Sequence, residues 1–253
     1  MTTGYNTQVD RKFRLVRLWS NAELKKIAHL FTGDIINVSG WKDEDKEGRT
    51  YADYFKQKNS YTITNYVSDA RGFQGKENEI FLDLTKPLDK ELVGKFDVVF
   101  NHTVLEHIFE VDKAFENLCA LSKDIVILVV PFLQPMHADY GDFWRFTPSC
   151  LQKLFAKNDM SVVYSSFNDP VNASVYVFCV GTKNPEKWKD ILPSNLKEDG
   201  EVPFLTKPLL NDGQTPMVGA NVILNIGPWM QLKYTALRGF LSNAKSRLKK
   251  SES

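Results

Sequence analysis

Two groups of polar side chains in this sequence could carry out proton transfer, and the first follows a short apolar segment. Residues 96–100 read as a buried strand, and Asn101, His102, Glu106 and His107 come after it in the stretch FDVVFNHTVLEH. Imidazole titrates near neutrality, so His102 and His107 are candidate catalytic bases. Glu106 and His107 are expected to begin the next helix, where they need not face the same way. The other interpretation of His107 is a helix-entry residue that packs the loop.

The second group lies in the loop that follows another apolar segment, IVILVV. The loop reads PFLQPMHADYGDFWRFT. His137 is a third candidate base, aromatic rings give stacking surfaces for sugars, and an arginine can bind a carboxylate or phosphate bidentately. We therefore expect His137, Tyr140, Trp144 and Arg145 to bind a substrate. In the alternative interpretation Trp144 anchors the loop to the core and Arg145 pairs with Asp142.

These groups would be positioned by alternating strands and helices. Five strands are predicted first, at residues 35–38, 61–67, 79–82, 96–100 and 124–130. Helices are predicted at residues 111–121 and 148–155, the latter capped by Thr147, and an antiparallel strand pair at 160–166 and 174–181. This order predicts an open, doubly wound α/β sheet, which binds ligands outside the carboxyl ends of its strands.

A further helix is predicted near the N-terminus. Ser20-Asn21-Ala22-Glu23 has the spacing of a capping box, and apolar residues then follow at helical spacing as far as Phe31. Gly33 is expected to end this helix.

Composition excludes several classes of protein. The 253 residues are 43% hydrophobic and 25% charged, with a formal net charge of +1, so no charge excess favours a nucleic-acid partner. The longest apolar run is residues 125–133, shorter than the roughly 20 residues of a membrane span. The N-terminus has no apolar core like that of a secretory signal, and we expect a cytoplasmic protein. The three cysteines are widely spaced, and the histidines and carboxylates lack compact ligand spacing, so no metal site is expected.

The sequence divides at about residue 181. Residues 1–181 carry the strand and helix pattern, whereas residues 182–253 begin with a proline-rich segment expected to wrap the domain. Residues 231–250 form a basic amphipathic helix pattern without an acidic residue. One interpretation is peripheral contact with the inner face of a membrane, and the other is a helix packed on the domain.

The element order, the FDVVFNHTVLEH segment and the PF…H.DYGDFWRFT loop together resemble class I S-adenosylmethionine-dependent methyltransferases, in particular the small-molecule type 11 group. The resemblance covers roughly residues 33–181. It implies a Rossmann-like, mostly parallel seven-stranded sheet with an antiparallel last strand. It also implies that S-adenosylmethionine lies across the carboxyl ends of the first strands.

The resemblance implies a set of cofactor-binding positions. They are Ser39 and Gly40 after the first strand, Asn65 at the end of the second, Asp83 and Leu84 after the third, and Asn101 and His102 after the fourth. His102 would then line the wall beside the transferred methyl group, and His137 and His107 would serve as bases on the acceptor side.

Two of these positions depart from the family pattern. The first turn usually holds several glycines, but here Ser39 and Trp41 flank a single Gly40. Asn65 stands where the family usually has a carboxylate that binds the ribose hydroxyls. A charge-assisted hydrogen bond contributes about 1.5–3 kcal/mol against about 1 kcal/mol for a neutral one, so weaker cofactor binding is expected. On this reasoning Asn65→Asp should tighten it.

Three functions compete on this evidence. The first is methyl transfer to oxygen or nitrogen of a small molecule or glycan, such as a sugar or sugar phosphate. The second is a catalytically weak or inactive binding protein that kept the methyltransferase fold. The third, a nicotinamide-dependent oxidoreductase, requires a G-x-G-x-x-G fingerprint, which residues 39–44 do not supply. A nucleic-acid partner is not expected, and the sequence does not determine the oligomeric state.

Overall fold

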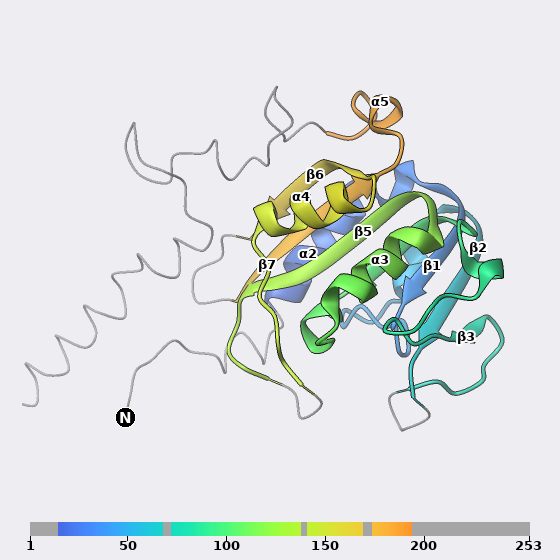
Figure 1. Cartoon of the computed structure of the whole chain (residues 1–253). Coiled ribbons are helices and arrows are strands. Elements are labelled where there is room, and N and C mark those ends of the chain that lie inside the picture. Colours follow the sequence, from blue (N-terminus) through green and yellow to red (C-terminus); the bar gives the residue numbers. More distant parts are fainter. Residues whose placement is uncertain (1–14, 68–71, 138–140, 169–173, 194–253) are drawn as a thin grey trace, which may run out of the picture.

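The computed structural model describes residues 15–67, 72–137, 141–168 and 174–193. Its central element is a seven-stranded sheet in the order β3-β2-β1-β4-β5-β7-β6 (Figure 1). The strands are β1 Thr32–Val38, β2 Gln57–Asn65, β3 Glu79–Phe81, β4 Phe96–His102, β5 Ser122–Leu133, β6 Ser161–Phe167 and β7 Val175–Thr182.

One strand runs against the others. β1 pairs in parallel with β2 and β4, β2 with β3, and β4 with β5, whereas β7 is antiparallel to both β5 and β6. The sequence prediction of a doubly wound, mostly parallel sheet with an antiparallel last strand is therefore confirmed. The predicted antiparallel pairing of the two final strands is confirmed as well.

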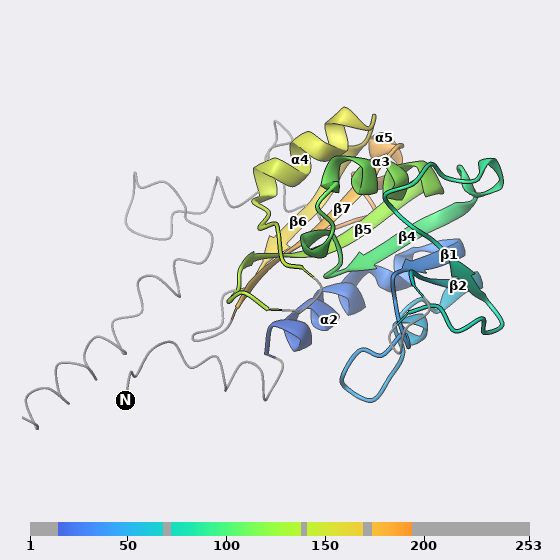
Figure 2. The same cartoon turned by 60° about the horizontal axis from the view of Figure 1, so that its bottom comes forward.

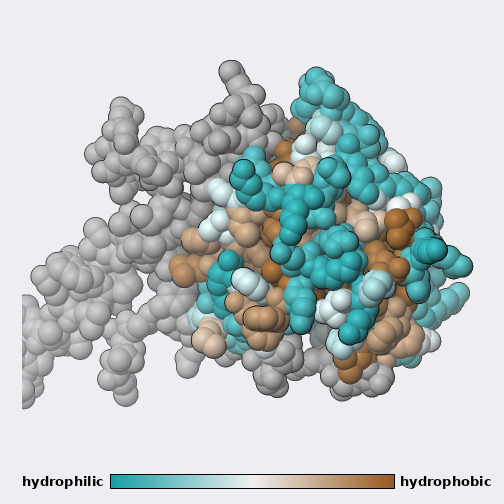
Figure 3. Space-filling view, viewed as in Figure 1, coloured by the Kyte–Doolittle hydropathy of each residue, from teal (hydrophilic) through white to brown (hydrophobic). Residues whose placement is uncertain are grey.

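Helices cover both faces of the sheet. Helices α3 (Val111–Leu121) and α4 (Pro148–Lys157) lie on one face, and α2 (Leu15–Ile27) lies on the other (Figure 2). Each face has its own core: Phe115 and Phe155 pack on the first, and Ile27 and Phe31 on the second. The strands between these layers are buried on both faces, which explains why β4 and β5 read as continuous apolar runs. The outer surface over α3 and α4 is largely hydrophilic (Figure 3).

Helix α2 begins earlier than the sequence indicated. Ser20 lies in the middle of α2 rather than at its N-cap, and its hydroxyl donates to the carbonyl of Arg17. Gly33 does not end the helix either. It is the second residue of β1, with a φ of +94°, and a Cβ there would approach the Asp97 carboxylate to 2.2 Å. Glycine is needed at this position for the backbone conformation and for that close approach.

The other predicted elements are present, most of them with shifted bounds. Helix α3 has the predicted bounds, and the side chain of Thr147 caps α4 by accepting from the Cys150 amide. β5 extends beyond its predicted end at residue 130, because Pro131 lies where the register with β7 shifts. Proline is tolerated at such irregularities since it has no N–H to donate.

The described part of the C-terminal segment stays on the domain. Trp188 of α5 (Pro185–Trp188) is buried, and its indole donates to Asp124 at the start of β5. The basic segment at residues 231–250 lies outside the described residues. Within the described residues, no helix has the length and apolar character needed to span a membrane.

Candidate functional site

The carboxyl end of β4 carries two buried polar residues. Asn101 is fully buried, and its amide donates to the carbonyl of Val38 at the end of β1, 3.0 Å away. The side-chain oxygen of Asn101 is buried without a hydrogen-bond partner among the described residues. An acceptor atom therefore lies unused where β1 and β4 end side by side.

His102 is held by the helix on the opposite side of the sheet from α3. Its Nε2 lies 2.8 Å from the Ser20 hydroxyl, and its Nδ1 lies 3.2 Å from the hydroxyl of Thr103. Burial, together with the nearby Arg17, holds the pKa of His102 well below its usual value. The imidazole is therefore neutral and enclosed, which suits a wall residue better than a base exposed to a substrate.

Glu106 and His107 belong to a separate turn. They end the 3-10 helix η4 (Leu105–His107), and α3 begins only at Val111, so the expectation that they begin the following helix is wrong. In this turn both side chains come close to His137 of the loop after β5. Nε2 of His107 lies 3.7 Å from Oε1 of Glu106.

Glu106 is a buried carboxyl group. Its side chain is 0% exposed, and neither oxygen has a hydrogen-bond partner among the described residues. Burial raises the pKa of Glu106 to about 8, and the positive charges of Arg145 and Arg17 offset this only in part. The backbone of Glu106 is also structural, because its carbonyl accepts from the amides of Phe143 and Trp144 and so joins the two loops.

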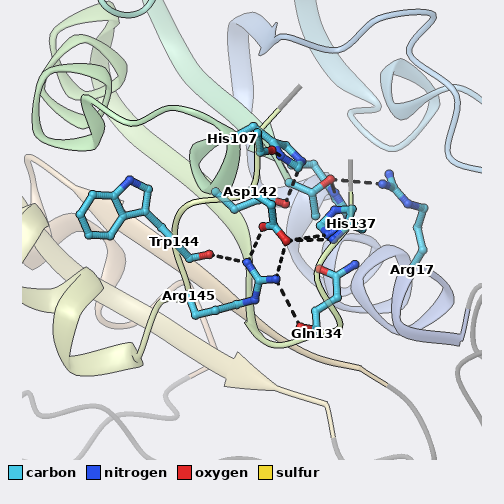
Figure 4. A network of polar contacts seen from close by, with 11 residues as sticks. Arg17, His107, Gln134, His137, Asp142, Trp144 and Arg145 are labelled. Atoms are coloured by element: carbon cyan, nitrogen blue, oxygen red, sulfur yellow. Dashed lines mark hydrogen bonds and ion pairs between the residues drawn. The ribbon is translucent and has the colours of Figure 1, made fainter. Parts of the chain in front are cut away.

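His107 and His137 come together from these two loops (Figure 4). Their ring centroids lie 5.0 Å apart, and Nδ1 of His107 lies 2.6 Å from the carbonyl of Gly141. A carbonyl can only accept, so Nδ1 of His107 carries the proton and Nε2 has the lone pair. Burial lowers the pKa of His107, and the neighbouring His137 lowers it further.

Arg145 binds a carboxylate of its own loop. It contacts Asp142 bidentately, at 2.5 and 2.7 Å, and also donates to the carbonyls of Trp144 and Gln134. Hydrogen bonds from Arg145 hold the pKa of Asp142 well below its usual value. The pairing of Arg145 with Asp142, the alternative in the sequence interpretation, is present, and it orients Asp142 toward His137 at 3.4 Å.

An exposed aromatic surface borders this site. Phe109 and Phe143 are 64% and 51% exposed and their rings lie 5.5 Å apart, while Trp144 lies 6.2 Å from Phe109. The indole of Trp144 donates to the carbonyl of Ile108, so Trp144 ties the two loops together and still offers part of its ring to solvent. Tyr140 lies outside the described residues.

The turn after β1 is packed against β2. The Ser39 amide donates to the hydroxyl of Thr64, and the Gly40 amide donates to the Thr64 carbonyl. A Cβ on Gly40 would approach the Asn37 side chain to 2.5 Å, so glycine is required here by the packing of the protein itself. Ser39 and Trp41 both have positive φ values, of 58° and 48°, in a turn where glycine is more usual.

Asn65 is fully engaged inside the protein. Its side-chain oxygen accepts from the Trp41 amide at 2.7 Å, and its nitrogen donates to the Trp41 carbonyl and to Glu79. The residue is buried and joins the β1 turn to the start of β3. Its geometry makes it a positioning residue for the turn.

After β3, Asp83 accepts from the amide and hydroxyl of Thr85, 2.9 and 2.7 Å away, which closes a local turn. Leu84 is buried in the core beneath α3. Both residues stand on the β3 side of the sheet edge, whereas the histidine cluster stands on the β4–β5 side.

The structure overturns a further expectation and adds two residues to the site. One ligand atom each from Glu106, His107 and His137 lie within 4.8 Å of one another, so the expectation that histidines and carboxylates lack compact spacing is wrong. Arg17 of α2 donates to Tyr51 and to Thr103 beside the site. The sequence held no signal for Arg17 or for Ser20, because their contacts are made across the sheet edge.

The strand order decides the fold. The order β3-β2-β1-β4-β5-β7-β6, with β7 reversed, is the sheet of the Rossmann-like methyltransferase fold. No family model and no curated protein sequence matches this chain significantly.

Many solved structures similar to this chain are S-adenosylmethionine-dependent methyltransferases. One was solved with the Haloferax volcanii Trm112 methyltransferase activator, at 10% identity and a TM-score of 0.49, covering 72% of this chain and 96% of that one. Another is magnesium protoporphyrin IX methyltransferase of Synechocystis PCC 6803 with bound S-adenosylmethionine (11%, TM-score 0.46, covering 71% and 84%). A third is the Burkholderia thailandensis 1,6-didemethyltoxoflavin-N1-methyltransferase with bound S-adenosylhomocysteine (14%, TM-score 0.44, covering 72% and 90%). These similarities are low, and the fold assignment rests on the strand order.

Proposed function

We propose that this protein binds S-adenosylmethionine at the carboxyl ends of β1 and β4 and transfers its methyl group to oxygen or nitrogen of a small molecule or glycan. The observation that carries the proposal is the methyltransferase strand order combined with chemistry-bearing groups at one edge of the sheet. Asn101 at the end of β4 and Glu106 just after it lie at that edge, both buried and both with unsatisfied oxygens. Fold alone does not imply function, so these groups are essential to the argument.

The residues at the edge fit the cofactor in part. The unused oxygen of Asn101 is an acceptor at the point where β1 and β4 meet, and Ser39, Gly40, Asp83 and Leu84 border the same edge. The role of Asn65 is indirect, since its three hydrogen bonds hold the β1 turn in position. S-adenosylmethionine supplies a methyl group on a sulfonium, whose positive charge is lost on transfer.

The acceptor side is formed by the loops after β4 and β5. A hydroxyl or amine acceptor gains the methyl group and loses a proton, and His107 and His137 are the proton acceptors that the geometry offers. Alignment of the reactants contributes up to about 7–11 kcal/mol, and a general base adds a factor of about 10²–10⁴ in rate. His102 closes the wall between cofactor and acceptor.

The acceptor class is suggested by the aromatic surface. Phe109, Phe143 and Trp144 offer ring faces beside the histidines, which suits a flat or sugar-containing molecule. Arg145 supports this loop through Asp142, so it shapes the acceptor site and orients Trp144 through the carbonyl contact.

A second candidate is a catalytically weak or inactive binding protein that kept the methyltransferase fold but lost tight binding of S-adenosylmethionine. It is favoured by the internal use of Asn65 and by the positive φ values of Ser39 and Trp41. The contacts of Asn65 are made within the protein, and the positive φ values place side-chain residues where the turn favours glycine.

Calorimetric titration of the full chain with S-adenosylmethionine and S-adenosylhomocysteine distinguishes the candidates. We expect binding and a stabilisation of about 2.7 kcal/mol when the ligand is a hundredfold above its Kd, because the ligand binds only the folded state.

Asn101→Ala should weaken the binding of S-adenosylmethionine by at least about tenfold, a loss of about 1.4 kcal/mol. Asn158→Ala, which removes a half-buried asparagine that donates to the Leu154 carbonyl at the end of α4, is the control. His137→Ala should leave cofactor affinity unchanged. No heat and no stabilisation at millimolar cofactor would leave only the second candidate.

A further inference from the structure

Glu106, His107 and His137 form a compact set of nitrogen and oxygen donors. One ligand atom from each lies within 4.8 Å of the other two. Ligands at about 2.1 Å from a tetrahedral zinc ion lie about 3.4 Å apart, close to the 3.7 Å between Oε1 of Glu106 and Nε2 of His107. The three donors come from two loops whose backbones are tied together at the Glu106 carbonyl.

The carboxyl group of Glu106 needs a partner that the described residues do not supply. It is 0% exposed, and both oxygens lack hydrogen bonds. A protonated carboxyl would not satisfy both oxygens, because the acceptor that faces it, Nε2 of His107, lies 3.7 Å away and the other oxygen still has no donor. A buried polar group left in this way is destabilising, and an ion is one of the few partners that satisfies it.

The neighbouring arginines do not fill this role. The hydrogen bonds of Arg145 go to Asp142 and to two backbone carbonyls, and those of Arg17 go to Tyr51 and Thr103. Nδ1 of His137 is likewise buried without a hydrogen bond. Unsatisfied polar atoms of Glu106 and His137 therefore belong to one cluster.

Both histidines have the supporting contacts typical of metal ligands. The Nδ1–H of His107 donates to the Gly141 carbonyl, which leaves the Nε2 lone pair directed toward Glu106. The backbone amide of His137 donates to Asp142, whose carboxylate lies 3.4 Å from the ring and is fixed by Arg145. Such carbonyl and carboxylate partners orient the imidazole rings of metal sites.

We infer that Glu106, His107 and His137 bind a first-row divalent transition-metal ion, with zinc as the ion to test first. Two imidazoles and one carboxylate suit Zn²⁺, Mn²⁺ or Fe²⁺ and leave coordination positions open for a substrate. The ion would bind the acceptor oxygen or nitrogen and lower its pKa before methyl transfer. This role rests on the proposed function, whereas the binding of the ion does not.

Metal content measures the inference directly. The full chain is stripped with a chelator, dialysed against Zn²⁺ or Co²⁺, and assayed by mass spectrometry and by the Co²⁺ absorption spectrum. We expect about one ion per chain, lost in Glu106→Gln and in His137→Gln, with circular dichroism to check folding. His29→Ala removes an exposed histidine outside the cluster and should keep the ion, and Cys150→Ser, at an exposed cysteine, should keep it too.

Loss of the carboxylate that supports His137 should also reduce the affinity for the metal ion. Asp142→Asn is expected to raise the Kd for Zn²⁺ by about 10–100-fold, the usual effect of losing an outer partner of a ligating histidine. The inference is overturned if the folded wild-type chain binds no ion, or if Glu106→Gln and His137→Gln bind as much as wild type.

Cofactor titration on the same samples separates the two proposals. If the chain binds the metal but does not bind S-adenosylmethionine, only the methyl-transfer proposal is overturned. If the chain binds S-adenosylmethionine but does not bind the metal, only the metal site is overturned.

Discussion

At the scale of single residues, the site is defined by which polar atoms are already used. Asn65 and Asn101 both end parallel strands, and the sequence treated them alike as cofactor contacts. In the structure Asn65 uses both side-chain atoms on Trp41 and Glu79, whereas the oxygen of Asn101 remains unused. Asparagine thus has two different roles at two strand ends. Asn65 positions the turn after β1, and Asn101, as we propose, binds the ligand.

This difference reverses the expected effect of Asn65→Asp. A carboxylate would lose the two hydrogen bonds that the amide nitrogen donates and would face Glu79 at the position where the amide now donates over 2.6 Å. We expect destabilisation of about 1–3 kcal/mol and weaker cofactor binding, measured by urea unfolding and calorimetry. The double variant Asn65→Asp/Glu79→Gln restores a donor–acceptor pair and should recover part of the stability. Tighter cofactor binding in the single variant would contradict this view of Asn65.

At the scale of elements, short turns and caps decide where side chains point. The η4 turn separates Glu106 and His107 from α3 and aims both at the loop after β5. That loop is fixed at its far end by α4, whose N-cap is Thr147. The position of Arg145 and Trp144 therefore depends on how well α4 begins.

Removal of the α4 cap should be measurable. Thr147→Ala leaves the Cys150 amide without the acceptor that now lies 3.1 Å away, at an expected cost of about 0.5–2 kcal/mol of unfolding free energy. Thr147→Ser keeps the oxygen and should cost much less. Equal stability of the alanine and serine variants in urea unfolding would show that the cap contributes nothing.

At the scale of the whole molecule, helix α2 closes the sheet edge from the side opposite α3. Arg17 and Ser20 of α2 contact Thr103 and His102, and the His102 ring also lies 5.5 Å from that of Tyr51 and 6.3 Å from that of Tyr176. His102 is thus enclosed by groups from several elements, and folding favours its neutral form.

This enclosure makes stability depend on pH. Below the usual pKa of 6.5 the unfolded chain takes up a proton at His102 that the folded chain does not, so proton uptake favours unfolding. We expect no contribution from His102 above pH 6.5 and a loss approaching about 1.4 kcal/mol per pH unit below it. Urea unfolding of wild type and His102→Gln over this range measures the difference, and His29→Gln, at an exposed histidine, is the control. The same pH slope in wild type and His102→Gln would contradict this account.

The sequence by itself determined the alternation of strands and helices along the chain, because apolar runs are local signals, and the resemblance supplied the seven-stranded sheet. It identified α3 and the strand pair β6–β7 with near-correct bounds and found both polar loops. It misjudged Ser20 and Gly33, since a capping pattern and a glycine have the same appearance in a helix interior or a strand. Only the tertiary structure decided that Glu106, His107 and His137 meet, that Arg145 is bound by Asp142, and that Asn65 faces inward. These facts depend on which side of a turn each side chain occupies and on contacts between residues far apart in sequence, which no local pattern encodes.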